Sequence, residues 1–167
     1  MNLYILRHGL AVERGTDGYE HDADRPLTSK GERKLGLIAD AMQELELEFD
    51  LILSSPFVRA RQTAEIVAAE LGLSKKVEFI RELEPGGSVK ELIAQIKSRK
   101  PLPEEVMLVG HEPYLSSLIS LLISGHTNIP VVMKKGGLCK LSTDALMHGR
   151  CAMLEWLLTP RQMGLMA

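Results

Sequence analysis

The chain has 167 residues, of which 45% are hydrophobic and 25% are charged, so it can bury a core of its own, and we expect a single domain over residues 1–167. Its formal net charge of −2 gives no general attraction to nucleic acid. No apolar run reaches the roughly 18 residues that indicate a membrane span, and the N-terminus has no signal-peptide pattern. We therefore expect a cytoplasmic protein with neither a nucleic-acid nor a membrane partner.

Apolar runs alternate with helical patterns along the chain, which is typical of an α/β domain. In chain order we expect a strand at 2–6, a helix at 28–45, a strand at 50–55, a helix at 56–71, a strand at 77–80, a helix at 88–97, a strand at 105–109, a helix at 113–124, and strands at 138–143 and 151–158. Ser29 with Glu32 and Ser88 with Glu91 have the spacing of capping boxes, and Thr28 is the other candidate cap of the first helix. The last two strands are expected to pair antiparallel at one edge of the sheet.

Three of the predicted strands end directly in polar motifs. The sequence RHG follows the first strand at 7–9, SSP ends the second at 54–56, and GHE follows the fourth at 110–112. If these strands are parallel, all three motifs lie at the same edge of the sheet. Open α/β sheets bind their ligands at the carboxyl ends of the strands, so the coincidence predicts a site at that edge.

Two arginines in this region indicate an anion site. Arg7 ends the first strand, and Arg59 lies one helical turn after Ser55, within reach of the same sheet edge. Guanidinium groups bind phosphate oxygens bidentately, and helix N-termini add backbone donors and a favourable dipole. The expected ligand is therefore a phosphoryl group, and free phosphate or sulfate would occupy the same pocket.

Two histidines supply reactive groups beside this anion site. A neutral imidazole is a nucleophile, and the arginines favour the neutral form of His8 because like charges disfavour protonation. One ring nitrogen must be held by a hydrogen bond for the other to attack, and the backbone near Gly9 can supply a carbonyl for that bond. His111, if protonated, would donate to a phosphoryl oxygen and stabilise the transition state.

These motifs stand in the order and at the distances of a known family. LRHG at 6–9, RPLTSKG at 25–31, SSPFVRARQTAE at 54–65 and VGHEP at 109–113 together resemble the histidine phosphatase superfamily, also called phosphoglycerate mutase-like or branch 1. Within it, the small size, the RPLT stretch and RELEPGG at 81–87 are most similar to the SixA-type phosphohistidine phosphatases. The resemblance covers essentially the whole chain.

The resemblance implies a three-layer α/β/α fold with a mostly parallel central sheet, helices on both faces and no cap insertion. It implies a metal-independent hydrolase without cofactor that removes phosphate from a phosphorylated histidine on a protein, such as a phosphotransfer domain of signal transduction or a phosphocarrier. His8 would form a covalent phosphohistidine intermediate. Arg7, Arg59 and His111 would bind the phosphoryl group, with Gly9 beside them.

No general acid is evident in the sequence. Larger relatives carry an insertion and a carboxylic acid that protonates the leaving oxygen, whereas here Glu82 and Glu84 are the nearest candidates, and solvated carboxylates near a turn are the alternative. The conjugate acid of an imidazole leaving group has a pKa of ~6.5, against ~15.7 for water, so a P–N bond needs little help from an acid. Arg25 is a further candidate at the pocket mouth, and Gly86-Gly87 is expected to form a turn.

Three other functions compete with this hypothesis. A metal hydrolase is disfavoured because HEPYL at 111–115 is not H-E-x-x-H and no other histidine pair has ligand spacing. A phosphatase of small phosphate esters or phosphosugars would need a working acid at Glu82 or Glu84. A non-catalytic module that binds phosphorylated partners would be natural only if His8 were replaced.

Overall fold

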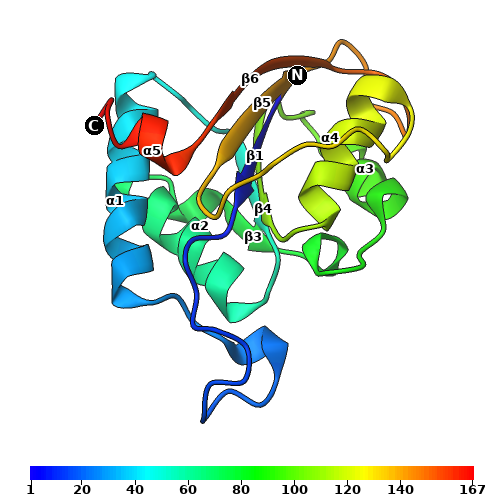
Figure 1. The fold of residues 1–167 in the computed structure, drawn as a ribbon. Helices are drawn as coiled ribbons and strands as arrows, with labels where there is room; N and C mark the ends of the chain where they lie inside the picture. The colour runs from blue at the N-terminus through cyan, green and yellow to red at the C-terminus, as the bar shows by residue number, and fades with distance from the viewer.

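The central element of the structure is a six-stranded sheet with the strand order β3-β2-β4-β1-β5-β6 (Figure 1). The computed structural model describes all residues from 1 to 167. Its strands are β1 (Asn2–Arg7), β2 (Leu51–Ser54), β3 (Val77–Phe79), β4 (Glu105–Gly110), β5 (Leu138–Ser142) and β6 (Met153–Leu158). The strands β1 to β4 are parallel, whereas β5 and β6 form the predicted antiparallel pair at one edge.

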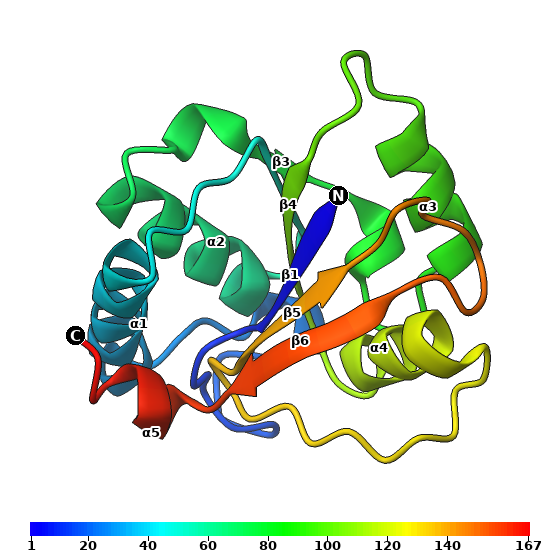
Figure 2. The same ribbon diagram turned by 90° about the horizontal axis from the view of Figure 1, so that it is seen from above.

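Helices cover both faces of this sheet, which confirms the predicted three-layer fold (Figure 2). One face carries α1 (Ser29–Glu44), α2 (Val58–Glu70) and the short α5 (Pro160–Met163), and the other carries α3 (Val89–Lys97) and α4 (Tyr114–Ser124). Ser88 caps α3 by accepting from the backbone N–H of Glu91 at 3.2 Å. Helix α5 is not predicted from the sequence, and it buries Met163 completely. None of the helices combines the length and the apolar character that a membrane span requires.

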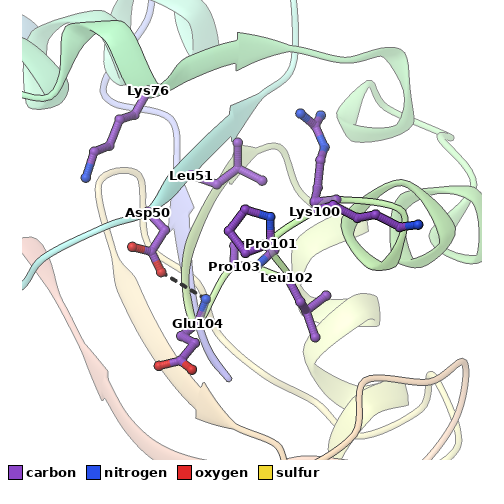
Figure 3. A pocket seen from close by; sticks show the side chains of 9 residues that line it. Asp50, Leu51, Lys76, Lys100, Pro101, Leu102, Pro103 and Glu104 are labelled. Carbon is purple, nitrogen blue, oxygen red and sulfur yellow. Dashed lines mark hydrogen bonds between the residues drawn. The ribbon is translucent and has the colours of Figure 1, made fainter.

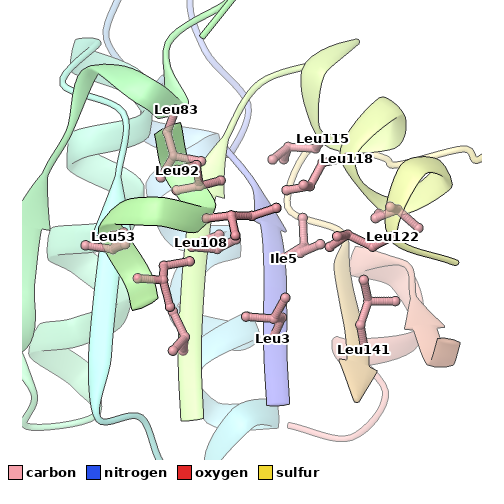
Figure 4. Close-up of a cluster of buried hydrophobic side chains, with 14 of the residues drawn as sticks. Leu3, Ile5, Leu53, Leu83, Leu92, Leu108, Leu115, Leu118, Leu122 and Leu141 are labelled. Atoms are coloured by element: carbon pink, nitrogen blue, oxygen red, sulfur yellow. The ribbon is translucent and has the colours of Figure 1, made fainter. Parts of the chain in front are cut away.

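Strand β1 contributes to two hydrophobic cores because successive side chains of a strand point to opposite faces of the sheet. Leu3 and Ile5 belong to the core beneath α3 and α4, whereas Tyr4 and Leu6 belong to the core beneath α1 and α2. Figure 4 shows the first of these cores, in which leucines of α4 pack beside β1. The strands that are buried on both faces therefore read as continuous apolar runs in the sequence.

Helix α1 packs directly on the segment that follows the RHG motif. Of the two candidate caps, Thr28 is the one used, and its side-chain oxygen accepts from the N–H of Gly31 at 3.0 Å. The predicted capping box of Ser29 and Glu32 does not form, because Ser29 is already the first residue of the helix. A Cβ on Gly31 would lie 2.2 Å from the carbonyl oxygen of Leu10, so only glycine permits this close approach.

Two glycines of α1 should respond to alanine in opposite directions. Gly31→Ala should lower the free energy of unfolding by about 2 kcal/mol or more, because the new methyl group overlaps a backbone oxygen. Gly36→Ala should raise it by about 0.5–1 kcal/mol, because nothing lies within 4 Å of the added Cβ and alanine favours the helix. Urea unfolding of both variants measures the difference, and equal effects would contradict the packing described for Gly31.

Candidate active site

The three polar motifs meet at one edge of the sheet, as the sequence predicts. Arg7 at the end of β1 pairs with Gly110 at the end of β4, and β2 runs parallel to β4 on its other side. The rings of His8 and His111, which directly follow β1 and β4, lie 5.1 Å apart between their centroids. Segments that are far apart in the chain therefore build one compact cluster.

His8 has the geometry of a nucleophile. It is 5% exposed, and its Nδ1 lies 2.7 Å from the carbonyl oxygen of Gly9, which accepts the ring N–H as predicted. Nε2 therefore keeps its lone pair, and the Nε–H of Arg59 donates to it at 3.3 Å. Burial lowers the pKa of His8 to about 3, with the bond to Gly9 opposing and the neighbouring charges adding to this effect. The ring is therefore neutral at pH 7.

Arg59 is buried in α2 and is held by Asp22 from the 3-10 helix η1 (Asp22–Asp24). Its terminal nitrogens donate to the Asp22 carboxylate at 2.9 Å and to the Asp22 backbone carbonyl at 2.6 Å. The same carboxylate also pairs with Arg14 and Arg25. Burial alone would raise the pKa of Asp22, but the bonds to Arg25 and Arg59 hold that pKa well below its usual range. An ionised carboxylate thus orients Arg59.

Thr63 ties the backbone beside His8 to the helix that carries Arg59. Its hydroxyl oxygen accepts from the N–H of Gly9 at 3.0 Å, and the hydroxyl donates to the carbonyl of Arg59 at 2.6 Å. Neither Thr63 nor Asp22 is predicted from the sequence. Thr63 could have been predicted, because it lies one helical turn after Arg59. Asp22 could not, because it lies among several acidic residues of an irregular loop.

Arg7 and His111 each leave one buried nitrogen without a protein partner. Arg7 donates through Nη1 to the carbonyl of Met133 at 2.7 Å, and its Nε is free. His111 Nε2 lies 2.8 Å from Ser55 Oγ, and its Nδ1 is free. The only other buried side-chain N or O atom without a partner is the hydroxyl of Tyr114. Because buried polar groups are normally paired, the two free nitrogens indicate a ligand rich in acceptors.

His111 is neutral in the ligand-free protein, in contrast to the protonated donor considered from the sequence. Burial lowers the pKa of His111 to about 3, and the guanidinium of Arg59 lowers it further. A neutral imidazole still carries one N–H. His111 can therefore donate to a phosphoryl oxygen without first taking up a proton.

Arg25 lies at the edge of the cluster and reaches it through Asp22. Its side chain donates to the carboxylate of Asp22 at 2.8 and 3.0 Å and also to the carbonyl of Val12. Its side chain is 11% exposed and forms no hydrogen bond with either histidine of the cluster. Arg25 and Arg59 therefore share one counterion at the predicted pocket mouth.

The two candidate acids follow β3 and are not joined to the cluster by a hydrogen bond or an ion pair. Glu82 belongs to the 3-10 helix η3 (Arg81–Leu83) and accepts from the Nε2 of Gln95 at 3.2 Å. The side chain of Glu84 is half-buried and has no hydrogen-bond partner in the site. Gly86 has a φ of 85° in the predicted turn, which favours glycine. Neither carboxylate forms a hydrogen bond or ion pair with the histidines or arginines of the cluster.

A separate pocket lies away from the cluster, at the amino-terminal ends of β2, β3 and β4 (Figure 3). Its main charged groups already have partners within the protein. Asp50 accepts from the backbone N–H groups of Glu104 and Glu105 at 2.9 and 3.0 Å, and Arg99 forms two bonds of 2.7 Å with Glu78. These groups need no ligand, unlike the free nitrogens near His8. No three His, Cys, Asp or Glu side chains come close enough together to hold a metal ion.

Comparison with known proteins agrees with this geometry. The sequence model of the histidine phosphatase superfamily (branch 1) matches residues 3–88, which is more than half of the chain. Phosphohistidine phosphatase SixA of Escherichia coli K12 is 29% identical, over 96% of this chain and 94% of its own length. An uncharacterized protein of a Picosynechococcus species is 42% identical over 87% of each chain.

A solved structure has the same fold. The protein histidine phosphatase SixA complexed with tungstate superposes with a TM-score of 0.82 at 28% identity, covering 96% of this chain and 98% of that one. The chain is therefore a phosphatase of the histidine phosphatase superfamily (branch 1), similar to SixA along nearly its whole length.

Proposed function

We propose that this protein removes the phosphoryl group from phosphohistidine on another protein, using His8 as the nucleophile and neither a metal nor a cofactor. The observation that carries the proposal is the state of the His8 ring. Its Nδ1–H is held by the Gly9 carbonyl, and its Nε2 lone pair lies beside a buried arginine. A neutral, oriented imidazole next to guanidinium groups is what attack on a phosphoryl group requires.

The reaction proceeds in two displacements. In the first, the Nε2 lone pair of His8 attacks phosphorus, and the P–N bond to the substrate imidazole breaks. The substrate ring carries a proton on its other nitrogen, so it leaves as neutral imidazole with the electron pair of the P–N bond and needs no further proton. In the second, a water molecule attacks the phosphohistidine at position 8, which releases inorganic phosphate and returns neutral His8.

Three groups stabilise the phosphoryl oxygens during both displacements. Arg7 donates through its free Nε, and Arg59 donates from the guanidinium that Asp22 orients. His111 donates through its free Nδ1. Donors that are oriented before the substrate arrives do not have to reorganise in the transition state, which is where charge stabilisation is most effective.

The position of the carboxylates favours phosphohistidine over phosphate esters. Neither Glu82 nor Glu84 forms a hydrogen bond or ion pair with the cluster, and Glu82 instead accepts from Gln95, so no carboxylate is held in place to protonate a leaving oxygen. Neutral imidazole leaves readily without a general acid because it is a weak base, whose conjugate acid has a pKa of ~6.5. The element order contains no inserted cap, which favours a histidine presented on a protein surface, such as that of a phosphotransfer domain or phosphocarrier. Similarity to SixA supports the same substrate class.

His8→Ala should lower turnover of a protein phosphohistidine by about a thousandfold or more, because the nucleophile is lost. Assays of wild type and variant with EDTA present, on a phosphohistidine protein and on p-nitrophenyl phosphate, measure this. We expect EDTA to have no effect and the ester to react more slowly. His148→Ala, which changes an exposed histidine, is the control and should match wild type. Retained activity in His8→Ala would contradict the covalent mechanism, and faster ester turnover would favour a small-molecule phosphatase.

Arg59→Lys should lower kcat/KM by about a hundredfold although the charge is kept, because lysine lacks the planar fork that meets Asp22 and the phosphoryl group together. Inhibition by inorganic phosphate should weaken in parallel. Arg61→Lys is the matched control two residues along α2, where the exposed side chain pairs only with Glu65. If Arg59→Lys and Arg61→Lys behave alike, Arg59 does not bind the phosphoryl group.

A further inference from the structure

Ser55 holds the ring of His111 from the end of β2. Both residues are buried, and Ser55 Oγ lies 2.8 Å from His111 Nε2. The backbone of Ser55 is anchored to β4, since its N–H donates to the carbonyl of Val109 at 3.0 Å. The ring of Phe57 lies 5.3 Å from the His111 ring between centroids. The imidazole is thus held by a strand end rather than by a long loop.

The hydroxyl of Ser55 has a single proton, and His111 Nε2 is the only acceptor that it meets. The Ser55 oxygen accepts from the backbone N–H of Phe57 at 3.3 Å, and donation to Nε2 at 2.8 Å gives the hydroxyl proton a partner, whereas the opposite direction would leave this buried proton unpaired. When Nε2 accepts, the one proton of a neutral imidazole resides on Nδ1. Nδ1 is the buried nitrogen that has no partner within the protein.

We propose that Ser55 is a positioning residue that fixes the tautomer of His111, so that neutral His111 donates its Nδ1–H to the phosphoryl group. The inference rests on the proposed function and adds the residue that makes a neutral donor possible. The opposite tautomer would turn a lone pair toward the phosphoryl oxygens and repel them. No bond to Ser55 forms or breaks in the reaction, and Ser55 acts only through His111.

A neutral donor and a protonated donor differ in their dependence on pH. A His111 that must be protonated loses activity as the pH rises through its pKa, whereas a neutral donor does not. The charged and titratable groups that face His111 are the cationic Arg7, Arg25 and Arg59, the anionic Asp22 and the neutral ring of His8. The depressed pKa values of His8 and Asp22 keep their charges constant between about pH 5.5 and pH 9. The phosphoryl group of the substrate titrates at pH ~6 for wild type and variant alike, so only the difference between their profiles reports on His111.

The first experiment compares the pH profiles of wild type and Ser55→Ala for dephosphorylation of a protein phosphohistidine between about pH 5.5 and pH 9. Without the hydroxyl proton, His111 can take the other tautomer, and its ring stays neutral throughout this range because its pKa is about 3. Ser55→Ala should therefore fall about a hundredfold below wild type at every pH, as for the loss of one oriented donor. Activity equal to wild type, or a deficit that disappears at the acid end, would overturn the proposal.

Ser54→Ala is the matched control. Ser54 is the neighbouring buried serine, and its hydroxyl donates to the carbonyl of Ser55 at 3.0 Å instead of to a histidine. It should keep wild-type activity at every pH. If Ser55→Ala does not fold, Ser55→Thr and Ser55→Val replace it, because threonine and valine have the same shape and differ in the hydroxyl. Threonine should then keep most of the wild-type activity and valine should lose it at every pH, and identical activities would overturn the proposal.

A second experiment determines the tautomer of His111 by a measurement that does not depend on enzyme activity. Ring-nitrogen NMR of protein labelled with 15N-histidine, with and without inorganic phosphate, should find the proton of wild-type His111 on Nδ1 and a changed tautomer in Ser55→Ala. A wild-type proton on Nε2 would overturn the inference even in an active enzyme. A proton on Nδ1 in a protein that does not dephosphorylate phosphohistidine would support the tautomer and contradict the proposed function alone.

Discussion

The parallel pairing of β2, β4 and β1 is the constraint on which the site depends. Because parallel neighbours end close to one another, segments that are far apart in the chain bring their first residues beyond the strand to one place. Each of these strands is mostly buried and apolar, and polar residues appear where the apolar run stops. The position of the site therefore follows from the same hydrophobic burial that forms the sheet.

Burial at that edge also sets the charge balance of the site. Exclusion of water keeps both imidazoles neutral, whereas Arg7 and Arg59 stay charged in the same place. Buried charges need partners, and the carboxylate of Asp22 supplies one for Arg59. Arg7 forms no salt bridge, and its one hydrogen bond within the protein goes to the carbonyl of Met133, although the charge of Glu112 acts on it from a distance. The unpaired Nε of Arg7 is thus available to an anion.

Local patterns predicted most of the fold and the central residues of the site, because apolar runs, caps and strand-end motifs depend on neighbours in sequence. The features that were not predicted depend on the path of a loop or on a single side-chain contact. Asp22 reaches the cluster through an irregular loop, and the bond from Ser55 depends on the rotamers of two residues. Met163 enters the core from a helix of four residues, which is too short for a periodic signal.

The hydroxyl of Thr63 couples two parts of the pocket, because it forms hydrogen bonds both with the backbone of Gly9 and with the backbone of Arg59 in α2. A substitution that shifts either part should therefore also move the other. Residues 13–18, by contrast, are exposed, and the loop that contains them is joined to the pocket through Asp22. Side chains of residues 13–18 can therefore be changed without removing the hydrogen bonds that hold Gly9 and Arg59 together.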